Sequence, residues 1–365
     1  DHRDEQQPNG VLPSIIPTGG WGYEWGNGPD WTSTIAIIPW QVYLFYGDTT
    51  LLSRSYDNIK LYVDYLDGIS ATGICNWGLG DWVPVKSKTP VAFTSTTYFY
   101  TDALILSKAA KILGRQDDHL KYKLLAEKIY EAFNTQYYDS AKAIYGSGLQ
   151  TELSSALHWG LVPEAEKARV AASLARRVEA DQVQLDVGLL GTKTILNALS
   201  DNGYAELAYR LATRDSFPSW GWWIKNGATT LYENWPIDAK SDLSMNHIMF
   251  GEIGAWFYKG LGGIRPDENA PGFSHILLNP NFPEDLNSFE AVHQSPYGEI
   301  VSGWTRKGKK ILYKVVIPPN SSATLSLPGG KAGLAGGKAV LKEIKPALPQ
   351  REIPLTAGTH YFEWK

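Results

Sequence analysis

The chain has 365 residues, of which 43% are hydrophobic and 20% charged, and its formal net charge is -4. This composition is typical of a globular protein with one large domain and a smaller one. No apolar stretch approaches the roughly 18–20 residues needed to cross a bilayer, so we expect no membrane span. The balanced charge, without a basic stripe, argues against a nucleic-acid partner. A single cysteine, Cys75, excludes a disulfide framework and a multi-thiolate metal site.

The sequence begins at Asp1 without the charged and apolar regions of a secretion signal. Its first residues, Asp-His-Arg-Asp-Glu-Gln-Gln, resemble the polar end of a helix already under way. We therefore expect the chain to be a piece of a longer polypeptide. The compartment stays open, and a periplasmic or extracellular location is favoured if the parent protein carries a signal peptide.

Helical hydrophobic spacing recurs along the chain up to about Gly263. Residues 117–133 are a clear case, in which apolar residues recur at helical spacing with Lys and Glu between them: Leu120, Leu124, Leu125, Ile129 and Phe133. Nine such segments are predicted, at 32–46, 50–67, 94–113, 116–133, 151–159, 163–179, 187–201, 202–214 and 246–259. Helices paired across short turns over this length form either a solenoid or a closed toroid of helical hairpins. The lack of a fixed repeat period disfavours the solenoid.

After Gly263 the pattern changes to short alternating or β-branched runs divided by Pro, Gly and Asn. The predicted strands are Ser274–Leu278, Glu299–Trp304, Lys310–Ile317, Ala323–Leu327 and Gly358–Trp364. The third of them is expected to end at Pro318-Pro319-Asn320. The pattern predicts a helical domain over 1–263 and a small β-sandwich over 264–365, with a hinge at Gly260–Pro266.

Tryptophan is unusually frequent, and nine of the 14 tryptophans lie in three Gly-rich loops that also carry carboxylates. The three groups are Trp21, Trp25 and Trp31; Trp77 and Trp82; and Trp220, Trp222, Trp223 and Trp235. Sugars have apolar C–H faces that stack on aromatic rings, and hydroxyls that bond to carboxylates. The loops together predict a carbohydrate site, whereas any one tryptophan is equally well explained as filling a gap between helices.

Two carboxylates in these loops are candidates for chemistry. Asp81 precedes Trp82 in Gly-Leu-Gly-Asp-Trp, where its alternative role is to cap a helix. Glu233 lies between Tyr232 and Trp235, in a stretch too aromatic to be a solvated face. We regard Glu233 as a candidate for proton transfer. The alternative is a structural Glu that accepts hydrogen bonds from backbone amides.

His247 follows Asn246 at the expected start of the last helix, with Ser244 as a possible cap. An isolated His is more often structural than functional. Because no cluster of His, Asp and Cys has ligand spacing, a catalytic transition metal is not expected. No Gly-rich phosphate loop and no Gly-x-Ser-x-Gly elbow is present, and no cofactor is predicted.

Several stretches, in the same order along nearly the whole helical region, resemble the catalytic domain of the α-L-rhamnosidases of glycoside hydrolase family 78. The matching stretches are Asp4–Gly10, Gly28–Trp31, Ile38–Trp40, Gly80–Trp82, Pro218–Gly221, Gly227–Glu233 and Asn246–Gly251. The resemblance implies a mainly α fold, an (α/α)6 barrel that here lacks its first helices, followed by a C-terminal β-sandwich. It also implies a bacterial glycosidase that hydrolyses terminal α-L-rhamnosides with inversion, the substrate being a rhamnose-containing glycan or glycoside.

The resemblance also implies roles for single residues. Glu233 falls on the general base of the family's Gly-Ala-Thr-Thr-Leu-Trp-Glu motif, with Tyr232 in place of the usual Trp. By the same resemblance, five residues are expected to contact the sugar: Trp31, Asp81, Trp82, Trp222 and His247. The matches at Trp222 and Asp81 are weaker than the other three.

The family's general acid is a Glu in an Arg-x-Glu-Arg-x-Gly-Trp-x-Gly-Asp type of motif, which this sequence lacks. Arg3-Asp4-Glu5 looks like its beginning, but Gln6-Gln7-Pro8 follows, and those residues match the family's next helix. We therefore do not assign Glu5 as the acid. Since a barrel of this type needs twelve helices and nine are predicted, the acid is expected upstream of Asp1.

Two other functions stay open. One is a different glycosidase or a polysaccharide lyase on the same helical toroid. A lyase needs a cation to neutralise a uronate, and the sugar loops offer only Lys225. The other is a non-catalytic carbohydrate-binding fragment, which the missing acid would permit.

Overall fold

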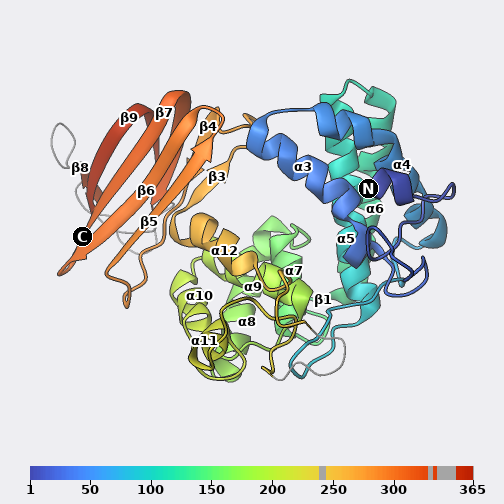
Figure 1. Ribbon diagram of the computed structural model, residues 1–365, viewed down its shortest axis with the longest axis horizontal. Coiled ribbons are helices and arrows are strands. Elements are labelled where there is room, and N and C mark those ends of the chain that lie inside the picture. Colours follow the sequence, from blue (N-terminus) through green and yellow to red (C-terminus); the bar gives the residue numbers. More distant parts are fainter. Residues whose placement is uncertain (238–243, 328–331, 335–350, 365) are drawn as a thin grey trace. The chain divides into compact units, whose positions relative to one another are not determined.

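The structure, a computed structural model, describes residues 1–237, 244–327, 332–334 and 351–364 (Figure 1). The chain divides into two compact units. The first comprises Asp1–Gln41, Thr49–Asn202 and Leu211–Phe250, and the second comprises Val42–Asp48, Gly203–Arg210 and Gly251–Lys365. The second unit therefore includes two short segments from the helical half of the sequence in addition to the strands.

Helices make up most of residues 1–250, coloured blue to yellow in Figure 1. They are α1 (His2–Glu5), α2 (Pro29–Thr32), α3 (Thr34–Tyr46), α4 (Thr50–Ile69), α5 (Val91–Ile112), α6 (Gln116–Tyr137), α7 (Gln150–His158), η1 (Glu164–Glu166), α8 (Lys167–Ala180), α9 (Leu189–Asp201), α10 (Ala205–Ala212) and α11 (Trp220–Lys225). A small hairpin, β1 (Tyr138–Asp139) and β2 (Ile144–Tyr145), follows α6. Within the described residues, the eight helical segments predicted before residue 215 all have a counterpart. The short helices α2 and α11 were not predicted, because they are too short to show a periodicity, whereas α1 lies in the stretch that was expected to be the end of a helix.

The long helix α5 is buried on nearly all sides, although it is rich in Ser and Thr. Its hydroxyls donate to carbonyl oxygens one turn earlier in the same helix: Thr96 to Ala92, Thr97 to Phe93, and Thr101 to Thr97. A hydroxyl bonded in this way needs no water, so these residues pack against neighbouring helices. This explains why α5 shows little of the polar face that a surface helix presents.

The predicted helix 246–259 is wrong over its first part. Helix α12 (Glu252–Trp256) begins at Glu252, and a π-helical turn, η2 (Phe257–Leu261), continues it. Neither His247 nor Ser244 belongs to the helix or its cap. The backbone N–H of His247 donates to the carbonyl oxygen of Leu231 at 2.8 Å, and this pairing with an earlier segment replaces the helical hydrogen bond.

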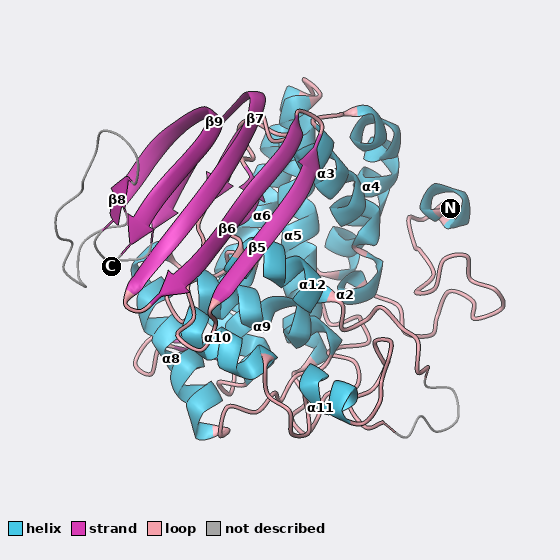
Figure 2. Ribbon diagram, turned by 60° about the vertical axis from the view of Figure 1, so that its left-hand side comes forward, coloured by secondary structure: helices cyan, strands magenta, loops and turns pink. Residues whose placement is uncertain are grey.

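The second unit contains a sheet in which the strand order is β3-β4-β7-β6-β5, with β9 paired to both β7 and β8 (Figure 1). Figure 2 shows β5, β6, β7 and β9 of this sheet side by side. The bounds are β3 (Ile264–Pro266), β4 (His275–Leu278), β5 (Ser288–Ser295), β6 (Gly298–Lys307), β7 (Lys310–Leu327), β8 (Ala332–Leu334) and β9 (Arg351–Trp364). Strand β4 runs parallel to β7, and the other pairs are antiparallel. The long strands β7 and β9 pair along almost their whole length.

Strand β7 corrects the prediction of two separate strands, because it passes through Pro318-Pro319-Asn320 without ending. The pairing of β7 with β9 shifts register between Ile317 and Ser322. Asn320 has a φ of 61°, in the left-handed region that Asn tolerates better than most residues. The turn-forming residues thus make an irregularity inside a strand instead of a loop.

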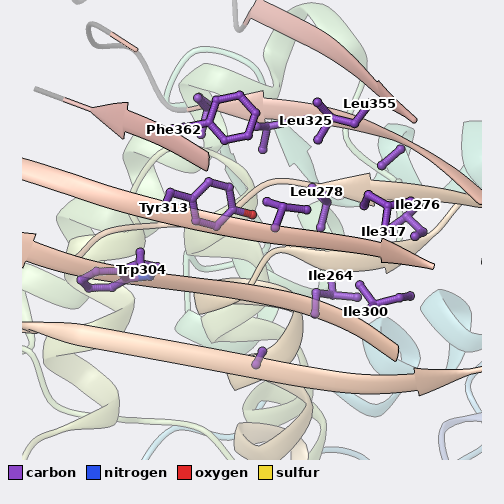
Figure 3. Close-up of a cluster of buried hydrophobic side chains, with 14 of the residues drawn as sticks. Ile264, Ile276, Leu278, Ile300, Trp304, Tyr313, Ile317, Leu325, Leu355 and Phe362 are labelled. Atoms are coloured by element: carbon purple, nitrogen blue, oxygen red, sulfur yellow. The ribbon is translucent and has the colours of Figure 1, made fainter. Parts of the chain in front are cut away.

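One face of this sheet encloses an apolar core, whose central side chains are drawn in Figure 3. The buried members include Ile276 and Leu278 of β4, Trp304 of β6, and Tyr313 and Leu325 of β7. Strands β3, β5 and β8 were missed from the sequence. The predicted hinge Gly260–Pro266 contains the end of η2 and strand β3. Gly263 has a φ of +70°, and a Cβ there would collide with the backbone of Asn279 and Pro280.

Among the described residues, no helix combines the length and apolar character that crossing a membrane requires. In the same part of the chain, no group of three or more His, Cys, Asp or Glu side chains is placed so as to hold a metal ion.

Candidate active site

Helix α2 consists of a single turn, and its polar side chains fix it to the surrounding helices. Asp30, Thr32 and Ser33, the residue that follows the helix, are all buried. The Ser33 hydroxyl donates to Asp102 Oδ2 in α5 at 2.6 Å, and the Thr32 hydroxyl bonds to that of Tyr62 in α4. Trp31 lies between these anchors and is only half-buried.

Asp30 binds the loop that carries the Gly-Asp-Trp motif. Its carboxylate accepts the backbone N–H of Gly80 at 2.8 Å and that of Leu79 at 3.3 Å, together with the hydroxyls of Thr94 and Ser95. Burial raises the pKa of Asp30 to about 6, against the opposing effect of these hydrogen bonds. Asp30 was not among the residues predicted from the sequence, where the only available signal was its place next to Trp31 in a matching motif.

The indole rings of Trp31 and Trp82 meet edge to face, with ring centroids 6.4 Å apart and an interplanar angle of 87°. The indole N–H of Trp31 is buried and has no acceptor among the described residues. A buried donor without an acceptor is uncommon in proteins and favours a site where a ligand oxygen binds. The structure therefore brings together two of the predicted sugar contacts, Trp31 and Trp82.

Asp81 lies beside this pair, but both of its carboxylate oxygens are bonded within the protein. Oδ2 accepts the hydroxyl of Thr151 at 2.6 Å and the N–H of Gly188 at 2.8 Å, whereas Oδ1 accepts the N–H groups of Leu190 and Gly191 at 2.7 and 3.2 Å. Burial raises the pKa of the Asp81 carboxyl, and these hydrogen bonds oppose the rise. Asp81 thus occupies the N-terminus of α9, a helix more than one hundred residues later in the chain.

Residues 187–189 connect the Gly-Asp-Trp loop to the third tryptophan group. The N–H of Leu189 donates to the carbonyl oxygen of Trp82 at 2.9 Å. Two residues earlier, the carbonyl oxygen of Val187 accepts the indole N–H of Trp235 at 3.1 Å. Trp82 and Trp235 are therefore held by neighbouring residues at the start of α9.

The third tryptophan group separates into structural and candidate functional members. Trp220, Trp223 and Trp235 are buried, and each indole N–H donates to a backbone carbonyl. Their rings pack against one another and against Phe250. Trp222 is only half-buried, and its buried indole N–H has no acceptor in the part of the chain that the structure describes. Of the four, Trp222 is the one available to a ligand.

Glu233 and His247 come from two segments that pair with each other. The N–H of Glu233 donates to the carbonyl oxygen of Ser244 at 2.9 Å, and the N–H of Ser244 donates to Glu233 Oε2 at 2.8 Å. The N–H of His247 donates to Leu231, two residues before the glutamate. The general-base candidate and the imidazole are thus positioned by one short ladder of hydrogen bonds.

The tautomer of His247 follows from its contact with Met249. The backbone N–H of Met249 donates to His247 Nδ1 at 3.1 Å, so Nδ1 is the acceptor nitrogen. In the neutral ring the proton must then be on Nε2. His247 consequently offers an N–H donor, which suits a bond to a hydroxyl oxygen.

Half-buried indoles with unpartnered N–H groups, a carboxylate and an imidazole donor are the features of a site for a sugar. The comparison with family models makes this specific. Residues 1–261 match the model described as the bacterial alpha-L-rhamnosidase 6 hairpin glycosidase domain, and residues 263–342 match the bacterial alpha-L-rhamnosidase C-terminal domain. The chain belongs to this bacterial α-L-rhamnosidase family, and the resemblance noted in the sequence is confirmed.

Individual relatives agree with the family match. The chain is 28% identical to an alpha-L-rhamnosidase of Formosa agariphila, of which it covers 41%, all of this chain being aligned. It also resembles the structure of the alpha-L-rhamnosidase from Dictyoglumus thermophilum, with 31% identity and a TM-score of 0.89 over 100% of this chain and 42% of that one. The Streptomyces avermitilis alpha-L-rhamnosidase complexed with L-rhamnose has 28% identity and a TM-score of 0.89, over 100% of this chain and 36% of that one. The chain therefore spans about two fifths of the length of the relatives it matches.

Proposed function

We propose that the chain provides the general base and most of the sugar pocket of an inverting glycoside hydrolase that releases terminal α-L-rhamnose. The observation that carries the proposal is the pairing of the Glu233 and His247 segments, in a family of which one member's structure contains L-rhamnose. The substrate is a rhamnose-containing glycan or glycoside.

Inversion requires two carboxyl groups about 6.5–9.5 Å apart, with a water molecule between one of them and the anomeric carbon. In this proposal Glu233 takes the proton from that water. A second carboxyl, which we assign to no residue of this chain, protonates the leaving oxygen. The amide of Ser244 holds Glu233 Oε2 and so fixes the direction of the carboxylate.

The rings of Trp31, Trp82 and Trp222 pack on the sugar and exclude water, and His247 donates to a ring hydroxyl. Asp81 was expected from the sequence to contact the sugar directly, and we propose a different role for it. Because four protein donors already occupy its oxygens, we propose that Asp81 fixes the position of Trp82 without touching the sugar.

The same proposal covers the finer architecture. We infer an (α/α)6 barrel for the helical part and a β-sandwich for the strands, with the domain boundary between residues 263 and 264. The match of residues 1–261 to a six-hairpin glycosidase domain and of residues 263–342 to a separate C-terminal domain supports this assignment.

The test is hydrolysis of an aryl α-L-rhamnoside by the complete product of the gene, with the anomer of the released sugar followed by NMR. Initial release of β-rhamnose supports inversion by two carboxyls. Cleavage of another aryl glycoside alone would discard rhamnose as the substrate, and an ultraviolet-absorbing unsaturated product would indicate a lyase. Binding of rhamnose without turnover would indicate a carbohydrate-binding protein.

The Glu233→Gln variant tests the base. It is expected to lower kcat by about 10²–10⁴-fold, the usual contribution of general acid–base catalysis. Glu5→Gln is the matched control, because Glu5 lies in a stretch that looks like the beginning of the family's general-acid motif but is assigned no catalytic role. The Glu5 carboxylate accepts the Tyr23 hydroxyl at 3.4 Å. Near-wild-type turnover by Glu233→Gln would show that the assignment of the base is wrong.

A further inference from the structure

Two large aromatic side chains beside the proposed sugar pocket are exposed and have no assigned role. Trp21 is 52% exposed and Trp25 is 43% exposed. Their ring centroids are 4.9 Å apart with an interplanar angle of 41°. Indole rings of this size are usually more deeply buried in a folded protein. Two of them together make an apolar surface that calls for an explanation.

These rings are continuous with the pocket. Trp25 meets Trp82 edge to face at a centroid distance of 6.1 Å, and Trp82 in turn meets Trp31. Trp21, Trp25, Trp82 and Trp31 therefore form one row of rings that runs from an exposed end to a half-buried end. Since the proposed rhamnose pocket lies at the Trp31 and Trp82 end, the exposed end is where a group attached to the sugar would lie.

The loop that carries Trp21 and Trp25 is firmly held. The buried side chain of Asn27 donates to the carbonyl oxygens of Leu12 and Tyr23, both at 2.6 Å, and accepts the N–H of Gly28 at 2.8 Å. The hydroxyl of Ser14 donates to the carbonyl oxygen of Trp25 at 2.7 Å. A loop held in this way presents its rings in a set position, which lowers the entropy lost when a ligand binds.

Within the loop, the N–H of Trp21 donates to the carbonyl oxygen of Thr18 at 2.9 Å, and the Thr18 hydroxyl donates to that of Gly22. Gly26 has a φ of +62° and approaches the side chain of Leu79, so that a Cβ there would lie 3.4 Å from Leu79 Cδ2. The loop thus lies against the Gly-Asp-Trp segment, and its two exposed rings are fixed next to Trp82.

We propose that Trp21 and Trp25 form the binding surface for the leaving group, and that they select leaving groups that contain a six-membered ring with an apolar face. A pyranose with an apolar C–H face and a phenol ring share this chemistry, because both stack on indole. The proposal rests on the proposed function, since it takes the sugar to be bound at Trp31 and Trp82. It goes beyond it by assigning the leaving-group side of the site.

The experiment compares three substrates in the complete product of the gene: 4-nitrophenyl α-L-rhamnoside, a rhamnosyl-glucose disaccharide, and methyl α-L-rhamnoside, whose leaving group has no ring. The Trp21→Ala/Trp25→Ala variant is expected to raise KM about tenfold for the first two, which corresponds to one or two lost stacking contacts. KM for the methyl glycoside and kcat for all three stay near the wild-type values. Tyr361→Ala, at a side chain that is also 52% exposed, is the matched control.

A loss for both ring substrates, or for only one of them, supports the proposal and names the kind of ring. Equal KM values for wild type and variant, or an equal rise in KM for the methyl glycoside, would overturn it.

Trp21→Leu/Trp25→Leu keeps apolar bulk if the alanine variant folds poorly, as judged by near-ultraviolet circular dichroism. The dissociation constant of 4-nitrophenyl α-L-rhamnoside, measured by fluorescence quenching in Glu233→Gln, separates the two proposals. If the wild type cleaves no rhamnoside, the proposed function fails. If replacing Trp21 and Trp25 by alanine in the Glu233→Gln protein raises this dissociation constant, the leaving-group surface is still supported.

Discussion

The carboxylate of Asp81 accepts the backbone N–H of Leu190 at 2.7 Å, which joins the Gly-Asp-Trp loop to the first turn of a helix far along the chain. Three further donors, from Thr151, Gly188 and Gly191, complete the coordination of the carboxylate. The side chain therefore performs for α9 the task of an N-cap, although it lies outside the helix and its loop.

Asp81→Ala is expected to lower the free energy of unfolding by about 3 kcal/mol, because it leaves buried N–H groups without an acceptor. Urea unfolding of the chain measures the change. The control is Asp57→Ala, which removes an 82% exposed carboxylate paired with Arg115 and should change stability by less than about 0.5 kcal/mol. A similar effect of the two substitutions would contradict the capping role.

The buried Asp30 makes a prediction about pH. Its pKa is raised to about 6 from an ordinary value of 3.8, so the folded state holds this proton more tightly than the unfolded state. Between pH 4 and pH 6 the folded state therefore binds more protons, and the contribution of Asp30 to stability falls as the pH rises. The loss is complete near pH 7, where the folded state has released the proton, and its size is about 3 kcal/mol.

Asp30→Asn isolates this contribution, because other carboxyls titrate equally in both proteins. The stability of the wild type relative to the variant is expected to fall between pH 4 and pH 7. Tyr62 and Cys75, which lie within electrostatic range of Asp30, have pKa values raised by burial and stay neutral over this range. A difference that does not change with pH would show that Asp30 has no raised pKa.

The sequence predicts those helices and strands whose structure depends on residues close together along the chain, and it fails where contacts between distant segments decide the structure. Local spacing of apolar residues was sufficient to predict helix α6, and Leu125, Ile129 and Phe133 are buried as expected. The same spacing included Leu120 and Leu124, which are 50% and 65% exposed. It was misleading for residues 246–251, because the hydrogen bond of His247 to Leu231 outweighs the local helical pattern. The turn signal at residues 318–320 was overruled in the same way by pairing of β7 with β9.

For the site, the motif order brought out Glu233, Trp31 and Trp82, but the role of Asp81 required knowledge of its partners at residues 188–191. Residue type and position alone do not distinguish Trp222 from Trp223, and only the weaker family match favoured Trp222. In the structure, the acceptor available to each indole N–H separates the two.

Gly188 makes a steric prediction at the same junction. A Cβ there would overlap the carbonyl oxygen of Trp82 and lie 2.8 Å from Asp81 Oδ1. Gly188→Ala should therefore displace the Gly-Asp-Trp loop from α9 and destabilise the chain by about 2 kcal/mol. Gly254→Ala in α12 is the control, because a Cβ there meets nothing within 4 Å, and alanine should stabilise that helix by up to about 1 kcal/mol. Thermal melts of the two variants that shift in the same direction would contradict the close approach at Gly188.

The adjacent tryptophans Trp222 and Trp223 give the sharpest test of which rings serve the sugar. Trp223 is 2% exposed, stacks on Trp235, and donates its indole N–H to the Trp235 carbonyl oxygen at 2.8 Å. Trp223→Phe should lower the free energy of unfolding by about 1 kcal/mol or more, because that carbonyl loses its donor. Trp222→Phe removes an N–H that has no acceptor among the described residues, so stability should stay unchanged or rise.

For rhamnose binding, in contrast to stability, Trp222→Phe is expected to have the larger effect and Trp223→Phe the smaller one. If the N–H of Trp222 donates to a rhamnose hydroxyl, Trp222→Phe should weaken rhamnose binding about five- to tenfold, the effect of one lost hydrogen bond. Trp223→Phe should leave the dissociation constant near the wild-type value in the fraction that is folded. Denaturant unfolding and rhamnose titration of both variants measure the two effects separately. A Trp222→Phe variant that is destabilised and binds rhamnose normally would place Trp222 in the core with its neighbours and remove it from the sugar site.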